Sequence, residues 1–229
     1  MFFTLHDNSY IAIIGDIKDS KKLENRKVIQ ERLSEVLNQI NNKYINAISS
    51  KFMITLGDEF QGLLCNGRDT IHIISEIKRV MHPVKIRFGV GIGSISTEIY
   101  KDIPLGADGP AYYKAREAIE YLKQKEKRNQ TEAADIRLEM DGGENLAAVT
   151  MVNTILMLLT VIEDSWSERQ REIISDMLIH QDSQAESAKR LNIKQPTIQK
   201  TLAKGNYYAY KQALDTIGNI LQEIKREDV

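Results

Sequence analysis

Residues 10–16 read YIAIIGD, and this stretch decides the fold. It is a short, continuous apolar run that ends in a glycine and an acid, a pattern typical of a buried central strand. Residues 25–44 follow with apolar side chains at three- and four-residue spacing, which indicates an amphipathic helix. The chain therefore begins with a strand and a helix that are expected to pack together.

Further strands and helices alternate up to residue 140. Gly57 and Asp58 separate two short strands, which suits a tight hairpin. Pro83 ends the helix expected at residues 70–81. The expected strands are 51–56, 60–65, 84–92 and 136–140, and the expected helices are 70–81 and 110–125. This order predicts an α+β domain over residues 1–141, with an antiparallel sheet and helices packed on one face.

Composition limits the classes of function. The 229 residues carry a net charge of −1, so any attraction for nucleic acid has to come from a local patch. The single cysteine excludes an intramolecular disulfide and a cysteine zinc cluster. The N-terminus does not read as a signal peptide, and the longest apolar run, residues 155–162, is shorter than the ~20 residues that span a bilayer. We expect no membrane partner and a cytoplasmic location.

Two aspartates form the first candidate site. Asp16 ends the first strand and Asp58 lies in the hairpin turn. If the hairpin lies beside the first strand, the two carboxylates meet and could bind Mg²⁺ together with substrate phosphates. Backbone N–H groups from Ile17 through Ser20 to Lys21 could cradle a phosphate. The alternative is structural, because Gly-Asp pairs form turns and aspartate caps helices.

The order of these motifs resembles the class III nucleotide cyclases. Residues 16–20 and 57–58 look like the two metal motifs of that family, and residues 57–60 are similar to the signature hairpin of diguanylate cyclases. Residues 86–93 and 109–116 resemble the strand and helix that follow in the cyclases. The resemblance implies a ferredoxin-like palm domain that binds a nucleotide. It implies that Arg116 stabilises charge on the phosphates, whereas the alternative for this residue is a surface salt bridge.

Three positions depart from the cyclase pattern. Tyr112 replaces an asparagine, Ile54 replaces a purine-selecting lysine, and Leu105 falls near the other base-selecting position. These changes favour sensing of a ligand over turnover. The whole chain also resembles the bacterial SatD family, through residues 15–20, 54–63 and 105–113. That resemblance supports a coherent N-terminal site and names no reaction.

The second part of the chain is expected to be helical. A connecting helix is predicted within residues 142–165 (145–163), followed by an all-α domain over residues 166–229. Its first helix opens with a capping box from Ser167 to Gln170, and Asn192 suits the left-handed turn before a helix at 195–204. The inward residues are expected to be Ala185, Ala188, Leu191, Ile198 and Leu202.

This segment resembles a winged or sigma-factor-type helix-turn-helix, which implies binding of double-stranded DNA. Residues 166–211 hold eight Lys/Arg and five Asp/Glu, a net charge of +3. The alternative is a helical bundle used for dimerisation, and the last helix, 209–224, is a plausible contact of a homodimer. The expected DNA-contacting residues are Gln195, Thr197, Gln199, Lys200 and Lys204.

Three functions follow from these observations. The first is a DNA-binding regulator whose palm domain senses a nucleotide or phosphate ligand with Mg²⁺. The second is an enzyme of nucleotide cyclase or nucleotidyl-transfer type with an accessory helical module. The third is a non-catalytic protein that uses both parts for protein contacts.

Overall fold

The structure is a computed structural model, and it describes residues 2–4, 9–103, 106–127 and 134–224. The strands are β1 (Tyr10–Ile17), β2 (Ile48–Leu56), β3 (Glu59–Leu64), β4 (Ile86–Gly93) and β5 (Ile136–Met140). The α-helices are α1 (Arg26–Lys43), α2 (Thr70–Met81), α3 (Pro110–Lys127), α4 (Leu146–Asp164), α5 (Glu168–His180), α6 (Gln184–Arg190), α7 (Gln195–Lys204) and α8 (Tyr207–Leu221). Short 3₁₀ turns lie at Ser20–Lys22 and Gly143–Asn145.

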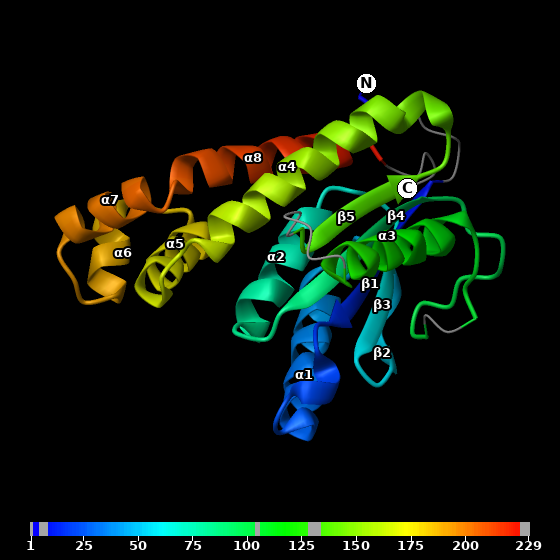
Figure 1. The fold of residues 1–229 in the computed structure, drawn as a ribbon, viewed down its shortest axis with the longest axis horizontal. Coiled ribbons are helices and arrows are strands. Elements are labelled where there is room, and N and C mark those ends of the chain that lie inside the picture. The colour runs from blue at the N-terminus through cyan, green and yellow to red at the C-terminus, as the bar shows by residue number, and fades with distance from the viewer. Residues whose placement is uncertain (1, 5–8, 104–105, 128–133, 225–229) are drawn as a thin grey trace.

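The first strand is the centre of the sheet. The strand order is β2-β3-β1-β4-β5, and β1 pairs antiparallel with both β3 and β4 (Figure 1). All eight residues of β1 are buried, which explains why its sequence is apolar without alternation. The result is the mixed α+β fold, with the βαββαβ order of a ferredoxin-like sheet extended by α3 and β5.

Helices cover both faces of this sheet, so the prediction of helices on one face was wrong. Ile11 and Ile13 of β1 pack in one cluster with α1 and α2, whereas Ala12 and Ile14 pack with α3 in a second cluster. The prediction of a fully antiparallel sheet was also wrong, because β5 pairs parallel with β4. A parallel neighbour needs a crossover helix, and α3 supplies it on the face that α1 and α2 leave open.

Glycines in β4 let α3 lie unusually close to the sheet. A Cβ built on Gly91 would come within 2.0 Å of the Ala111 carbonyl oxygen, and one on Gly89 within 2.1 Å of the Ala115 carbonyl oxygen. Any larger residue would therefore push the helix away. The glycines of the strand predicted at residues 84–92 thus have a packing reason that does not depend on a ligand.

The long helix α4 joins the sheet to the C-terminal helices. It contacts β5 and α8, and α8 also contacts α2, so the helical part rests against the palm part (Figure 1). By length and composition alone, the helical stretch 143–164 is apolar enough to cross a membrane. Val152, Leu156 and Leu159 are buried against the rest of the chain, which accounts for part of this apolarity.

Three short helices follow and pack on one another. Ser167 and Gln170 form the capping box at the start of α5, and Asn192 adopts the left-handed conformation (φ 51°) between α6 and α7. Ile198 and Leu202 of α7 are fully buried. Ala185 is exposed, contrary to expectation, and the small buried neighbours on α6 are instead Ser187 and Ala188.

The last helix uses its apolar side within the chain. Tyr207, Tyr210, Leu214, Ile217 and Leu221 of α8 are all buried. The expected homodimer contact through this helix therefore lacks the apolar face on which it was predicted. A homodimer formed through another surface stays a prediction.

Candidate functional site

The two predicted aspartates lie at one edge of the sheet. Asp16 of β1 pairs with Glu59 of β3, and Asp58 immediately precedes Glu59 in the hairpin. The backbone N–H of Ile17 donates to the Asp58 carbonyl oxygen at 3.1 Å. Gly57 supplies the positive φ (60°) that the turn requires. The hairpin thus brings the backbones of these acidic residues into contact.

The carboxylate of Asp16 is held by two cations. Arg87 Nη1 lies 2.5 Å from Asp16 Oδ2, and Lys123 Nζ lies 3.1 Å from Asp16 Oδ1. Asp16 is buried, so these partners offset the cost of removing its charge from water. Within the described residues no group of three His, Cys, Asp or Glu side chains is placed to hold a metal ion. In this arrangement the donor set does not fit Mg²⁺, and binding by Asp16 and Asp58 stays a prediction that requires Lys123 to move.

The predicted phosphate cradle is largely occupied by the protein itself. The backbone N–H groups of Ile17 and Lys18 donate to the carbonyl oxygens of Asp58 and Lys85. The Ser20 hydroxyl donates to the Asp58 carboxylate. Lys21 is exposed on the same loop. Of the predicted phosphate ligands, only Lys21 has its polar side chain turned to solvent.

Arg116 lies beside this edge and is paired with an acid. Its guanidinium donates to both carboxylate oxygens of Glu59, at 3.0 and 3.2 Å, and half of its side chain is exposed. Both the salt-bridge role and a role in binding phosphates are consistent with this position. Tyr112 is buried with its hydroxyl unpaired within the described residues, Ile54 is half-buried in β2, and Leu105 lies outside the described residues.

A row of buried ion pairs runs from this edge to the C-terminal helices, and sequence reasoning missed it. Arg87 also binds Glu126 of α3, which in turn binds Lys18 at 2.7 Å. Lys18 is 2.7 Å from Asp135, just before β5. The row continues through Lys78 of α2 to Glu163 of α4.

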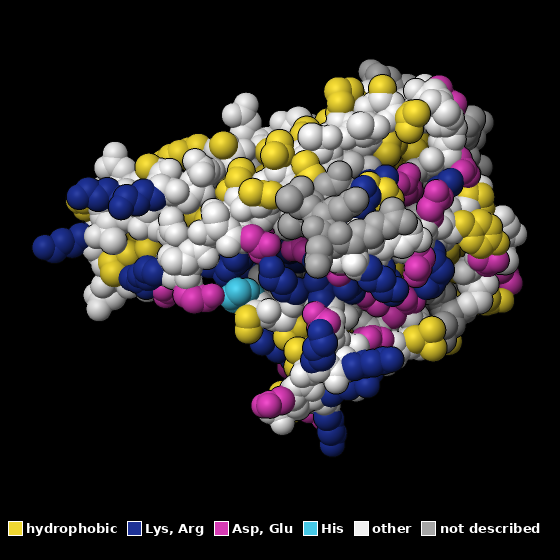
Figure 2. Space-filling model, viewed as in Figure 1, with side chains coloured by type: hydrophobic (Ala, Val, Ile, Leu, Met, Phe, Trp, Pro, Cys, Tyr) yellow, Lys and Arg dark blue, Asp and Glu magenta, His cyan; other side chains and the backbone are white. Residues whose placement is uncertain are grey.

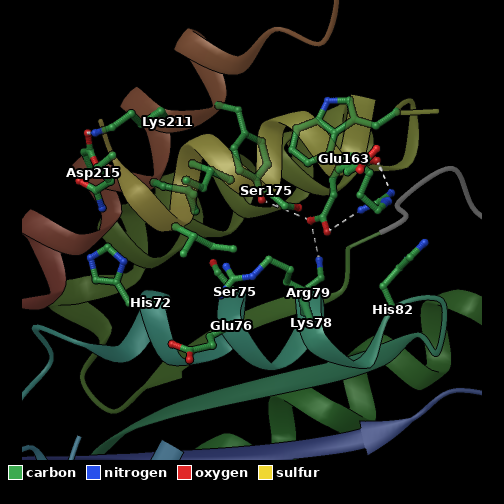
Figure 3. A pocket seen from close by; sticks show the side chains of 18 of the residues that line it. His72, Ser75, Glu76, Lys78, Arg79, His82, Glu163, Ser175, Lys211 and Asp215 are labelled. Atoms are coloured by element: carbon green, nitrogen blue, oxygen red, sulfur yellow. Dashed lines mark hydrogen bonds and ion pairs between the residues drawn. The ribbon is translucent and has the colours of Figure 1, made fainter. Parts of the chain in front are cut away.

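The second half of this row joins the palm part to the helical part (Figure 3). Lys78 Nζ lies 3.1 Å from Asp135 Oδ2 and 2.9 Å from Glu163 Oε2. Glu163 also accepts hydrogen bonds from Arg171 of α5 and Tyr210 of α8. No local sequence pattern predicts these pairs, because their members come from four helices and from the segment before β5.

The charges in this row shift one another's pKa values. Burial alone would lower the pKa of Lys78, but Glu163 and Asp135 raise it above its ordinary value. Burial alone would raise the pKa of Asp135, but Lys78 and Lys18 hold it below its ordinary value. Both groups are therefore charged at neutral pH, and their contact is a true ion pair.

The second candidate surface is α7. Its residues Gln195, Thr197, Gln199, Lys200 and Lys204 are all exposed. Most basic residues of the helical part are neutralised: Arg190 binds Asp176 and Asp182, and Lys211 binds Asp215.

Three lysines around α7 are different. Within the described residues, Lys194, Lys200 and Lys204 have no ion-pair partner, and the sequence holds no acid between Glu186 and Asp215. Basic side chains project from the end of the molecule formed by α6 and α7 (Figure 2). The end of the molecule formed by α6 and α7 is thus a local positive patch on a nearly neutral protein.

Comparison with known families identifies the chain. The SatD family profile matches residues 10–220. The chain belongs to the SatD family. This SatD-family protein is also similar in fold to solved structures, although no curated protein sequence matches it. The helix-turn-helix and its sigma-factor type stay predictions.

Three solved structures illustrate the likeness. A bacterial light-regulated adenylyl cyclase is 17% identical, with a TM-score of 0.40, over 57% of this chain and 75% of that one. A regulator of polyketide synthase expression from Bifidobacterium adolescentis is 14% identical, with a TM-score of 0.30, over 94% and 86%. The guanylyl cyclase Cya2 is 14% identical, with a TM-score of 0.28, over 49% and 70%. At such TM-scores the likeness carries no argument about ligand or activity.

Proposed function

We propose that this SatD-family protein is a DNA-binding regulatory protein and that α7 is the helix that contacts double-stranded DNA. The observation that carries the proposal is the exposed polar side of α7, where Lys194, Lys200 and Lys204 have no ion-pair partner in the part of the chain that the structure describes. The helix follows α6 after a short turn at Asn192, and its buried side is fixed by Ile198 and Leu202. A rigid helix with one free polar side is what recognition in a major groove requires.

The side chains on α7 have the chemistry for this task. Glutamine pairs with an adenine edge, so Gln195 and Gln199 are suited to reading bases. Lys194, Lys200 and Lys204 are suited to phosphate contacts, which supply most of the affinity without specifying sequence. Because these lysines have no acid to release among the described residues, binding DNA costs no internal ion pair.

A gel shift with a matched control tests this proposal. Replacing Gln199 and Lys200 together with Ala is expected to weaken binding to a random-sequence 30-base-pair duplex by about fivefold at low salt, because the phosphate contact of Lys200 is lost. The control replaces Gln124 and Lys125 on α3, the same residue pair on a helix of the palm part. Equal affinity of the two variants would remove α7 as the DNA-contacting helix.

The proposal includes a nucleotide or phosphate ligand of the palm part. What supports it is the gathering of Asp16, Asp58 and Arg116 at one edge of the sheet. If Asp16 participates in Mg²⁺-dependent nucleotide binding, Asp16→Asn abolishes that binding while the circular dichroism spectrum stays unchanged. Asp102→Asn, at an exposed acid that binds Lys51, is the matched control. Binding that persists in Asp16→Asn would remove the palm site.

The second candidate function is nucleotidyl transfer or cyclisation. The observation in its favour is the same edge, where Asp16 of β1 pairs with Glu59 of β3 and Glu59 binds Arg116. Incubation of the pure protein with ATP or GTP and Mg²⁺, followed by chromatography of the products, tests it. A product formed by the wild type and absent with Asp16→Asn would establish the enzyme; intact nucleotide in both would leave the palm part a sensor.

A further inference from the structure

A pocket of about 450 Å³ lies at the junction between the palm part and the C-terminal helices. Its floor is α2, and its other walls come from α4, α5 and α8 (Figure 3). This volume is in the range of cavities that bind small molecules. The pocket is separate from the edge of the sheet that holds Asp16. Neither of the two sites predicted from the sequence, the aspartate pair and the DNA-contacting helix, includes it.

Most acids around this pocket already bind a neighbouring side chain, whereas Asp69 has no ion-pair partner among the described residues. Glu163 is bound by Lys78 and Arg171, and Glu76 accepts from Lys43 Nζ at 2.6 Å and from the Tyr44 hydroxyl at 3.0 Å. The remaining paired acids are Glu168 with His82, Glu172 with Arg169, and Asp215 with Lys211. These carboxylates therefore do not compete for the remaining donors in the pocket.

Three hydrogen-bond donors in the pocket have no partner within the described residues. Ser75 and Arg79 are one turn apart on α2, and Ser175 faces them from α5 (Figure 3). All three are partly exposed, so a ligand can reach them. Burial lowers the pKa of Arg79 from the ordinary value, and the nearby charge of Glu76 offsets this only in part. A partly desolvated guanidinium that no carboxylate binds directly among the described residues would gain from a bound anion.

We propose that this pocket binds a small phosphate-bearing organic ligand, with the phosphate on Arg79, Ser75 and Ser175. A guanidinium offers a planar fork of donors that matches phosphate oxygens. Two hydroxyls from the opposite walls suit a tetrahedral group, whose oxygens point in several directions. The organic part would lie against Leu178, Leu214 and the ring of Tyr210, which line the same pocket.

Such a ligand would contact both parts of the chain at once. Arg79 and Ser75 belong to the palm part, whereas Ser175 belongs to the helix that packs on α7. Bound phosphate would therefore favour one placement of the helices relative to the sheet. The inference goes beyond the proposed DNA binding, because the pocket can hold a ligand whether or not α7 contacts DNA.

Trp166 provides a direct measurement. It is the only tryptophan, it lines the pocket, and its indole Nε1 donates to the Gly205 carbonyl oxygen at 2.8 Å. The experiment titrates the full chain with adenosine monophosphate, guanosine monophosphate, ribose 5-phosphate, inorganic phosphate and succinate while recording tryptophan fluorescence. We expect a saturable change with at least one organic phosphate, and a weaker one with inorganic phosphate.

Variants assign the change to the pocket. Arg79→Gln is expected to weaken binding at least about tenfold, as the loss of a charge-assisted hydrogen bond predicts. Arg68→Gln, at an exposed arginine before α2 that does not line the pocket, is the matched control and should bind normally. Arg79→Gln should also melt no lower than the wild type, which separates lost binding from lost folding.

Several results would overturn the inference. One is a flat titration with every organic phosphate, and another is equal binding by Arg79→Gln and the wild type. Saturation with succinate but with none of the phosphates would equally contradict the proposed ligand class. Because the titration contains no DNA, its failure leaves the proposal for α7 untouched, and a negative gel shift leaves the pocket untouched.

Discussion

Replacement of Lys78 with Met tests the idea that buried ion pairs fasten the helical part to the palm part. Lys78 lies between Asp135 and Glu163, and the side chains of all three are less than one-fifth exposed. Methionine keeps most of the length of the side chain and removes the charge. The change leaves two buried carboxylates with one cation fewer.

The structure sets the size of the effect. Removing one partner of a buried pair costs about 3–5 kcal/mol. Asp135 keeps Lys18 and Glu163 keeps Arg171, so we expect the lower end, about 3 kcal/mol. For a chain of this length that corresponds to a fall in Tm of about 6–12 °C.

Thermal and urea unfolding followed by circular dichroism measure this loss. Lys85→Met is the matched control, because Lys85 binds Asp164 of α4 at 2.9 Å but the pair is well exposed, at 56% and 37%. We expect the control to lose about 0–1 kcal/mol. If Lys78→Met lowers the free energy of unfolding no more than Lys85→Met does, the buried row does not fasten the two parts.

Three further predictions concern stability. Gly91→Ala is expected to cost about 3 kcal/mol or to prevent folding, because the new methyl meets the Ala111 carbonyl, whereas Gly143→Ala, with open space around it, should fold with a Tm near that of the wild type. Asn192→Ala should lose about 1 kcal/mol in urea unfolding because of its left-handed backbone, and Asn192→Gly should lose almost none; equal losses would argue against that conformation. The folded-state pKa of Asp135 is lowered, so the stability that its carboxylate contributes is present above its unfolded pKa of about 3.9 and disappears as pH falls through the folded value. The difference in free energy of unfolding between the wild type and Asp135→Asn should therefore be full at pH 7 and shrink below about pH 4. A difference that stays constant with pH would contradict the ion pairing.

Much of the fold could be predicted because its signals are local. The apolar run of β1, the spacing in α2 and the capping box at Ser167 each lie within one short segment. The parallel pairing of β5 could not be predicted in this way, because it depends on which face of the sheet remained open for α3. Local patterns specify elements, and long-range packing specifies their neighbours.

The candidate sites also differ in whether local patterns or long-range packing place their residues. The exposure of Lys200 and its neighbours follows from helical spacing within α7, so the sequence was enough to place them. The cations on Asp16 come from β4 and α3, more than 70 residues away, and no spacing rule connects them. The pocket around Arg79 likewise exists only because α5 and α8 fold back over α2.

The salt dependence of DNA binding tests the role of α7 most directly. The measurement is fluorescence anisotropy of a labelled duplex at NaCl concentrations from about 50 to 200 mM, where counterion release dominates the affinity. If Lys194, Lys200 and Lys204 each contact a phosphate, replacing all three with Gln makes the negative slope of log K against log salt shallower by about 2.7 for each bound chain. An unchanged slope and affinity in the triple variant would contradict the assignment of α7 as the DNA-contacting helix.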